Sequence, residues 1–474
     1  MCGRLRLPGA GYPRLTCRPE HDSGCPKLGH AQCGTAETKS SRDRPLPDRT
    51  LHRLADAIGT RLENVAWHSE AIRAELDRML PRGLPVQTDV LADRLMRTFP
   101  QPFSPGSKRI AASLLHHPVL PELARHCTRH DIWPAPHLTP PVMAPAPAFA
   151  TLDLPVIDTP AALAAWLLLP PEALDGYVDR FGWRQDHGDM AVNHYVTRLL
   201  PKPNGSHRLI EAPKPRLKAF QRQILAGILA QVPQHGDSFA FRTGRDCRSG
   251  AARHAGEEVV IGVDMQDFFS SIPYGRVFGL FRCLGYPASV AHALTGLCTV
   301  ITPARVRDRL PYDRRQRLRM AHLPQGAPTS PALSNIICDR LDRRLAGLAR
   351  SVGAQYSRYA DDMTFSGDRT IIAPVRAAVP EIVRDAGFSL NTAKTRVMPT
   401  GARQVVTGLV VNDHLNIARR DIDRLKAVIH AGRWMSDKAV HDRLMGQIGW
   451  VRNVNPAKAD KLAALMRRAA ERAG

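Results

Sequence analysis

The sequence lacks the features of a membrane or secreted protein. No apolar run approaches the roughly 20 residues that a helix needs to cross a bilayer, and Met1–Pro8 carries positive charge without the apolar stretch of a signal peptide. Cysteine is also sparse, with nine residues and no C-x-x-C pair. An odd number of cysteines without such pairs indicates reduced thiols rather than a disulfide framework. We therefore expect a cytoplasmic protein.

Zinc binding is the alternative use of the N-terminal cysteines. Cys17, Cys25 and Cys33 lie near His21 and His30, but this spacing matches no standard set of zinc ligands. The surrounding segment is rich in Pro, Gly, Ser and Arg and has few large aliphatic residues. Such a composition cannot bury enough apolar surface to fold alone. The sequence therefore predicts a disordered basic tail and disfavours zinc.

Acidic residues are few relative to basic ones. The chain has 66 Lys and Arg against 44 Asp and Glu, which gives a net charge of +22 and a pI near 10.2. A basic surplus spread along the whole chain favours a polyanionic partner. A membrane is disfavoured because no apolar segment accompanies the charge. Nucleic acid is therefore the expected partner.

The residue patterning divides the 474 residues into five parts. After the N-terminal tail, apolar residues recur every three or four positions, which predicts a small helical segment. A Pro-rich stretch then predicts a stiff linker, a core of mixed strand and helix patterns follows, and amphipathic helices end the chain. The predicted boundaries are 1–50, 51–133, 134–160, 161–411 and 412–474.

The clearest chemistry lies in Tyr356–Gly367, where two β-prone runs flank Asp361 and Asp362. This pattern predicts a hairpin whose tight turn presents two adjacent carboxylates. A solvent-facing turn is the alternative, because Asp is favoured in turns for local hydrogen bonding. Two carboxylates held this close repel each other unless cations lie between them. Magnesium is the cation that we expect.

A second acidic position supports a metal site. The apolar run Val259–Val263 predicts a buried strand that ends at Asp264. A third carboxylate beside the hairpin completes a donor set for two divalent ions, of which one activates an attacking hydroxyl and the other stabilises the leaving oxygen. The three acids therefore predict phosphoryl transfer.

At these residues the sequence resembles the reverse transcriptases. Tyr359–Asp362 resembles their Y-x-D-D box, and Asp264 resembles their first palm aspartate. The resemblance covers about residues 160–474 and implies an α+β fold of the right-hand polymerase type. Fingers and a palm with an antiparallel sheet would occupy 161–411, and a helical thumb would occupy 412–474. The helical segment before the core would be an N-terminal extension.

The resemblance also implies an activity and a cofactor. The chain would be an RNA-directed DNA polymerase, a nucleotidyltransferase that uses deoxynucleoside triphosphates. Asp264, Asp361 and Asp362 would be catalytic, and these residues together with Met265 would bind two Mg²⁺ ions, for which Mn²⁺ can substitute.

Five residues are assigned to the incoming nucleotide by the same resemblance. Asn204-Gly205 is a strong hairpin signal, and the basic residues beside it match positions that grip the triphosphate. A phenylalanine after the first aspartate matches the steric gate that excludes a 2′-hydroxyl by clash. A glutamine matches the polar reader of the nucleotide loop, and a lysine lies near the leaving pyrophosphate. The five are Lys202, Arg208, Phe269, Gln325 and Lys394.

Outside this context the basic members of the set would be read as solvated surface charges. The loop that carries Gln325, Leu323–Pro331, predicts a following helix with Ser330 as its N-cap and Pro331 in its first turn. Basic residues on two predicted helical regions are assigned to template phosphates, because they lie outside the apolar stripes. They are Lys214, Arg216, Lys218, Arg222, Arg424 and Arg433.

Two short elements resemble the retron branch of bacterial reverse transcriptases. Val406-Thr407-Gly408 matches the retron VTG triplet, and Gly250–His254 resembles the NAxxH element, with Gly250 in place of Asn. The resemblance implies a structured cognate RNA as template and primer, priming from a 2′-hydroxyl, and a branched RNA-linked DNA product. It further implies a role in antiphage defence, with a possible effector protein as partner.

Two alternatives stay open at this point. One keeps the enzyme but changes its branch, to an abortive-infection, diversity-generating or intron-type reverse transcriptase. No maturase or endonuclease segment follows the predicted thumb before Gly474, which disfavours an intron protein. The other is a catalytically inactive RNA-binding scaffold, which would not need the three acids.

Overall fold

The computed structural model describes residues 48–80, 88–131, 133–134, 141–179, 182, 193–202 and 205–472. Of the predicted N-terminal tail, only residues 48–50 are described, and they begin the first helix. The candidate zinc ligands Cys17, Cys25, Cys33, His21 and His30 lie outside the described residues. Within the described ranges, no helix is both long and apolar enough to span a bilayer.

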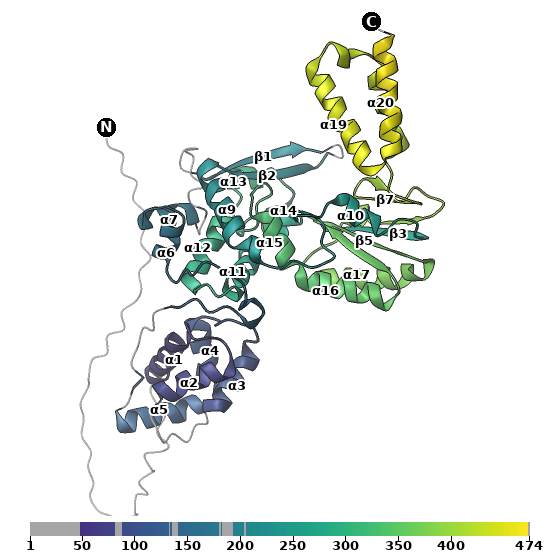
Figure 1. Cartoon of the computed structure of the whole chain (residues 1–474). Helices are drawn as coiled ribbons and strands as arrows, with labels where there is room; N and C mark the ends of the chain where they lie inside the picture. Colours follow the sequence, from purple (N-terminus) through teal and green to yellow (C-terminus); the bar gives the residue numbers. More distant parts are fainter. Residues whose placement is uncertain are drawn as a thin grey trace, which may run out of the picture. The chain divides into compact units, whose positions relative to one another are not determined.

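The N-terminal segment is helical (Figure 1). Helices form where apolar residues recur every three or four positions, and the buried positions include Leu54, Ile58, Leu62, Ile72 and Leu76. The helices are α1 (Asp48–Leu62), α2 (Ser69–Met79), α3 (Thr88–Thr98), α4 (Ser107–Leu115) and α5 (Val119–His130).

The described part of the Pro-rich segment packs against later residues. The backbone N–H groups of Ala144 and Ala146 donate to the carbonyls of Gly285 and Cys283. Gly285 has φ +99, and a Cβ there would lie 2.4 Å from the Pro145 nitrogen, so glycine permits this close approach. Elements η1 (Pro147–Phe149), α6 (Pro160–Trp166) and α7 (Pro171–Val178) follow.

The central part of the chain begins with a hairpin of β1 (Tyr195–Pro201) and β2 (His207–Pro213), and α9 (Pro215–Gly227) follows it. The strands pair in the register Leu200 to Arg208, as the two β-prone runs predict. Gly205 at the turn has φ +78, whereas Asn204 lies outside the described residues.

The central sheet is antiparallel and, in the described chain, has the strand order β4-β5-β3-β6. Its strands are β3 (Val259–Asp264), β4 (Gln355–Tyr359), β5 (Asp362–Gly367) and β6 (Arg396–Pro399). Val259 and Ile261 face the main apolar core, whereas Val260 faces a second core, because successive strand side chains point to opposite faces. Both faces of β3 are therefore covered.

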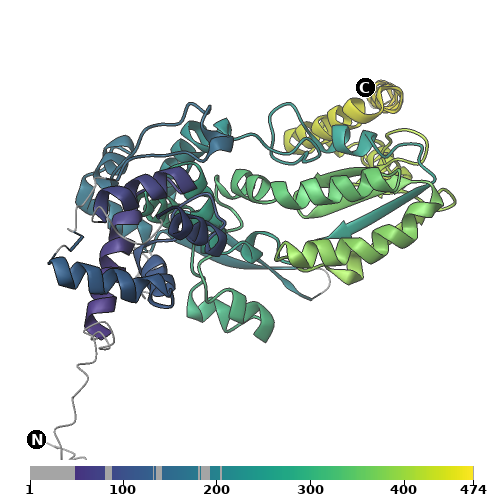
Figure 2. The same ribbon diagram turned by 90° about the horizontal axis from the view of Figure 1, so that it is seen from below.

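Helices α16 (Asp339–Ser351) and α17 (Ile372–Asp385) lie side by side along one face of this sheet (Figures 1 and 2). They bury Leu345, Val375, Val379 and Val383 in the main core. Helices α10 (Cys247–Ala252), α11 (Tyr274–Cys283), α12 (Ala288–Cys298), α13 (Ala304–Arg307), α14 (Tyr312–Arg317) and α15 (Ser330–Ile337) complete this region.

One capping prediction is wrong. Ser330 is the first residue of α15, and Thr329 is its N-cap without a side-chain capping bond. The apolar stripe that follows Pro331 also spans two helices, because α15 ends before Cys338 and α16 begins after it. The stripe continues across the break since the side chains on both sides of Cys338 enter one core.

The C-terminal region begins with the two-residue strands β7 (Val405–Val406) and β8 (Leu409–Val410). Helices α18 (Arg419–His430), α19 (Lys438–Val454) and α20 (Pro456–Glu471) follow and enclose the second apolar core around Leu425, Ile429, Leu444, Ile448 and Leu462. The predicted class, α+β with an antiparallel sheet after a helical N-terminal segment, is confirmed.

Candidate active site

The three predicted acids meet at one end of the central sheet. Asp264 is the last residue of β3 and lies directly opposite Asp362, the first residue of β5. Asp361 lies in the two-residue turn between β4 and β5, because Tyr359 pairs with Asp362 across the hairpin. Asp264 and Asp362, which are 98 positions apart in sequence, thus become neighbours through strand pairing.

The turn itself has an uncommon backbone. Ala360 has φ +58, a left-handed conformation that costs a residue with a Cβ about 1 kcal/mol. The Asp361 carbonyl accepts a hydrogen bond of 3.0 Å from the Met265 N–H, on the residue after Asp264. The turn is therefore anchored to the strand that carries the third acid.

Lys394 neutralises part of this acidic cluster. Its Nζ lies 2.8 Å from Oδ2 of Asp264, and this hydrogen bond is the main reason that the pKa of Lys394 is raised. The backbone just before Lys394 is attached to the same strand, because the Asn391 N–H donates to the main-chain carbonyl of Asp264 at 2.8 Å. Lys394 is therefore held beside the carboxylates as an ammonium ion.

One lysine does not balance three carboxylates. Loss of solvent around the side chain raises the pKa of Asp361, with the Asp264 charge adding to the effect. The same loss of solvent, followed by the charges of Asp361 and Asp264, raises the pKa of Asp362 to about 6. Each cause penalises the charged form. The cluster therefore has an excess of negative charge that a bound cation would relieve.

The donor set fits divalent ions that are shared with a substrate. In the described part of the chain, no group of three or more His, Cys, Asp or Glu side chains is arranged to hold a metal ion by itself. Magnesium normally takes one or two protein carboxylates and completes its shell with water and substrate phosphates. Three carboxylates at an open end of a sheet suit that mode, and a closed protein cage is not needed.

A cavity of about 430 Å³ adjoins the acids. Its lining includes Asp264, Asp362, Lys394, Tyr359 and Thr407. The cavity lies between the end of the sheet and the β7 to β8 turn, so a substrate of several atoms can reach the carboxylates from this side.

Aromatic side chains border the site next to the first aspartate. The Phe269 ring is half-buried and lies 5.3 Å from the buried ring of Phe268 and 6.3 Å from Phe241, between centroids. Phe241 is 48% exposed, has φ +59, and also lies 6.4 Å from the Tyr359 ring. The sequence predicted a role for Phe269 but none for Phe241, because an exposed loop aromatic has no local signature.

The residues predicted to bind the incoming nucleotide lie at different distances from the three acids. Burial raises the pKa of Asp361, and the positive charge of Arg208 offsets a small part of that rise, so the two groups lie within electrostatic reach. Lys202 lies at the hairpin tip, where its N–H donates to the Ser206 carbonyl at 2.8 Å. The main-chain carbonyl of Gln325 accepts from the Glu211 N–H at 2.9 Å, which attaches the loop that carries Gln325 to β2.

Helix α14 supplies two residues that sequence reasoning missed. Arg314 and Arg317 lie 3.2 and 3.0 Å from the carboxylate of Asp267, three positions after Asp264. Arg314 also donates to the His207 carbonyl of β2 at 2.9 Å. These bonds tie the fingers hairpin to the loop of the first aspartate, and the 50 residues between Asp267 and Arg317 leave no local signal for them.

Comparison with known proteins shows which family the chain is similar to. Residues 200–409 match the family described as Reverse transcriptase (RNA-dependent DNA polymerase). The chain is 43% identical over 281 residues to the retron Mx65 reverse transcriptase of Myxococcus xanthus, with 57% of this chain and 64% of the relative covered. Over this segment the chain is therefore similar to reverse transcriptases, and the relative is a retron enzyme.

Two further relatives are also named as retron reverse transcriptases. The retron Mx162 reverse transcriptase of Myxococcus xanthus is 35% identical, over 64% of this chain and 65% of the relative. The retron Ec86 reverse transcriptase of Escherichia coli is 33% identical, over 48% of this chain and 66% of the relative. The chain spans slightly less than two thirds of the length of each of these three relatives. The predicted resemblance to retron enzymes is confirmed.

The first retron-like element lies beside the start of α10, the helix that contains Gly250 of the second element. Thr407 has φ +48 in the β7 to β8 turn, and its hydroxyl donates to the Cys247 carbonyl at the start of α10 at 3.2 Å. Gly250, which replaces the Asn, lies against Phe239, where a Cβ would be 3.2 Å from the ring. The position thus has little room for a larger side chain.

His254, at the other end of the second element, supports the β4 to β5 hairpin that carries Asp361. It is fully buried, and its ring nitrogens lie 2.7 Å from the hydroxyls of Ser366 on β5 and Ser357 on β4. Burial lowers the pKa of His254 to about 3, so the ring is neutral. One histidine therefore bridges both strands that flank the Asp361 turn.

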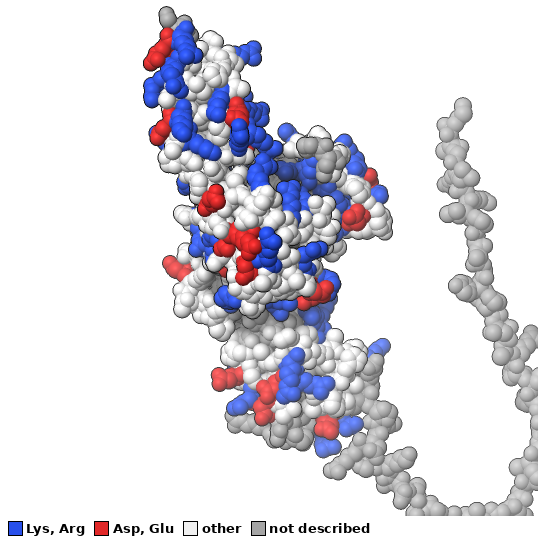
Figure 3. Space-filling model, turned by 90° about the vertical axis from the view of Figure 1, so that its right-hand side faces the viewer, with Lys and Arg blue, Asp and Glu red and all other residues white. Residues whose placement is uncertain are grey.

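Basic side chains extend over the domain and the C-terminal helices. Lys214 precedes α9 and is partly exposed, whereas Arg216, Lys218 and Arg222 are exposed on it. In the C-terminal region Arg424 is exposed on α18 and Arg433 is exposed between α18 and α19, and Figure 3 shows Lys and Arg gathered over this part at its top. These positions suit contacts with nucleic-acid phosphates, which position a strand without reading its sequence.

Proposed function

We propose that the chain is a retron-type reverse transcriptase, an RNA-directed DNA polymerase that adds deoxynucleotides by divalent-cation catalysis. The observation that carries the proposal is the convergence of Asp264, Asp361 and Asp362 at one end of the sheet within the segment that matches the reverse transcriptase family. A scaffold that only binds RNA would not need this excess of negative charge beside a basic nucleic-acid surface.

The carboxylates, with the Met265 carbonyl, would hold two Mg²⁺ ions, or Mn²⁺ in their place. When bound, such ions activate the attacking hydroxyl and neutralise the leaving pyrophosphate. Lys202 and Arg208 would bind the triphosphate, and Phe269 would lie beneath the sugar, where a 2′-hydroxyl would clash. Gln325 would position the nucleotide through its loop.

Lys394 is suited to the leaving group. Its raised pKa keeps it protonated at neutral pH, and its contact with Asp264 places the ammonium beside the reacting phosphates. On nucleotide binding it would exchange the carboxylate for the pyrophosphate oxygen and donate a proton there. General acids of this kind contribute about 10²- to 10⁴-fold in rate.

The retron assignment implies a finer function. The template and primer would be a structured RNA recognised by its shape. Synthesis would start from a 2′-hydroxyl of that RNA and give branched RNA-linked DNA, in a system of antiphage defence with an effector protein. The support is the identity to three proteins named as retron reverse transcriptases together with the presence of both retron-like elements, Val406-Thr407-Gly408 and Gly250–His254.

A primer-extension assay tests the enzyme. Purified protein with a primed RNA template, Mg²⁺ and deoxynucleotides should extend the primer, and the double variant Asp361→Asn with Asp362→Asn should not. Absence of extension by the parent protein would favour the inactive scaffold. Sequencing of copurified nucleic acid tests the branch: RNA-linked DNA is expected for a retron, and its absence would favour another bacterial reverse transcriptase.

A further inference from the structure

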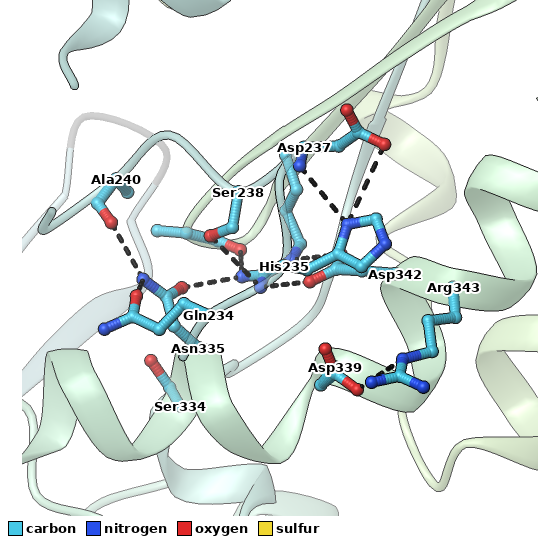
Figure 4. A network of polar contacts seen from close by, with 12 residues as sticks. Gln234, His235, Asp237, Ser238, Ala240, Ser334, Asn335, Asp339, Asp342 and Arg343 are labelled. Atoms are coloured by element: carbon cyan, nitrogen blue, oxygen red, sulfur yellow. Dashed lines mark hydrogen bonds and ion pairs between the residues drawn. The ribbon is translucent and has the colours of Figure 1, made fainter. Parts of the chain in front are cut away.

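The residue before the Y-x-D-D sequence, Arg358, is a charged side chain with no exposed surface. Its guanidinium donates to both carboxylate oxygens of Asp342, at 2.7 and 2.6 Å. It also donates to Oδ1 of Asn335 at 3.1 Å and to the Ser238 hydroxyl at 3.3 Å. Figure 4 shows Asn335, Asp342 and Ser238 converging from α15, α16 and the loop before Phe239. The ion pair with Asp342 compensates the buried charge.

A further bond of this guanidinium reaches the active site. Nη1 of Arg358 donates to the Ala360 carbonyl at 3.0 Å. Ala360 is the turn residue with the left-handed backbone, and the next carbonyl, that of Asp361, is held by the Met265 N–H. The peptide groups on both sides of Asp361 are therefore fixed, one by Arg358 and one by the strand of Asp264.

The same group of residues holds the loop that leads to Phe241. The Phe239 N–H donates to the Arg358 carbonyl, and the Arg358 N–H donates to the Asp237 carbonyl, both at 2.8 Å. Nδ2 of Asn335 donates to the Ala240 carbonyl at 2.8 Å. Phe241 follows directly and places its ring beside Phe269 and Tyr359.

We propose that Arg358 is a positioning residue for the reaction. Through Ala360 it fixes the direction of the Asp361 carboxylate, and together with Asn335 it fixes the position of the Phe241 ring. The turn that would bind metal and the aromatic ring that would border the nucleotide are therefore held by the same buried residue. The inference rests on the proposed polymerase function, because it assigns those two surfaces to metal and nucleotide.

Lysine cannot replace arginine in this role. A guanidinium has five N–H donors in a rigid fork, whereas an ammonium is a single point with three. Arg358→Lys keeps a charge for Asp342 but cannot span both Asp342 oxygens, Asn335 and the Ala360 carbonyl. Tyr356→Phe is the matched control, because it removes the 2.8 Å bond from the Tyr356 hydroxyl to Asp342 and leaves the turn untouched.

The experiment compares parent, Arg358→Lys and Tyr356→Phe in three measurements: thermal melting, steady-state extension, and Mn²⁺ binding by electron paramagnetic resonance. For Arg358→Lys we expect kcat to fall at least about 30-fold, Mn²⁺ to bind at least about fivefold more weakly, and KM for primed template to stay within about threefold. Tyr356→Phe should stay within about threefold in every kinetic and binding value.

Arg358→Lys with kcat and Mn²⁺ affinity near those of the parent would overturn the proposal. Equal losses in both variants would do so too, since they would indicate a role in stability alone. Asn335→Ala tests the second part of the proposal, the positioning of Phe241. In this variant KM for deoxynucleotides should rise and discrimination against ribonucleotides should weaken, while the affinity for Mn²⁺ stays unchanged. If the parent does not extend primers, the polymerase function fails, whereas the Mn²⁺ comparison still decides the positioning role.

Discussion

The His254 bridge behind the catalytic hairpin can be tested through its chemistry. In His254→Phe the ring volume is kept, but both ring nitrogens are lost, and the hydroxyls of Ser357 and Ser366 lose their bonds to this residue. Each buried hydroxyl left without a partner costs about 1 to 3 kcal/mol. Because two hydroxyls are affected, we expect the free energy of unfolding of the variant to be about 2 to 6 kcal/mol lower than that of the parent at pH 7.5.

The pH dependence gives a sharper test. The pKa of His254 is lowered to about 3 in the folded chain and is about 6.5 when unfolded. Between these values only the unfolded chain binds the proton, so stability falls as pH falls through 6.5 and this loss ends near 3. From pH 7.5 to 5.5 the parent should lose about 1.4 kcal/mol that the variant does not lose.

Urea denaturation followed by tryptophan fluorescence at the two pH values measures both effects. The control is His414→Gln, because His414 is exposed and should change neither quantity. If His254→Phe is as stable as the parent, or if both lose the same stability between pH 7.5 and 5.5, the bridge does not stabilise the hairpin as argued.

Three further predictions concern the substrate. Lys394→Gln should lower kcat about 100-fold with little change in KM for primed template, and an unchanged single-turnover rate would refute the general-acid role. Phe269→Ala should raise ribonucleotide incorporation relative to deoxynucleotides by about tenfold, or about 1.4 kcal/mol; equal discrimination in parent and variant would exclude the steric gate. Replacing Arg424 and Arg433 by Gln should reduce the slope of log affinity against log salt by about two, measured by fluorescence anisotropy with a primed template, and an unaltered slope would remove both from the phosphate contacts.

Local patterns predicted the elements that carry the acids. The hairpin around Asp361 and the strand that ends at Asp264 could be predicted because runs of β-prone residues and turn residues act over a few positions. The β7 to β8 strand pair was readable for the same reason, with Thr407 and Gly408 in the positive-φ positions of its turn. That these separate runs share one site came from the resemblance and not from periodicity.

The buried residues that hold the site in place could not be predicted from local patterns. Arg358 and Asp342 are buried and bonded to each other, whereas by type both would be assigned to the surface. His254 was recorded as part of a retron-like element, but its contacts with two strands depend on sheet pairing more than 100 residues away. A buried polar residue is defined by its partners, which the local sequence does not specify.

The sequence by itself determined the chemistry of this protein: three carboxylates, a basic surplus and the motifs of a reverse transcriptase, each encoded by residue type and short spacing. Only the tertiary structure decided how the reacting groups are held, with Lys394 on Asp264, Arg358 on the turn carbonyl and His254 across the hairpin. The physical reason is that burial and hydrogen-bond partners arise when distant segments pack together, and these set the direction and the pKa of a side chain.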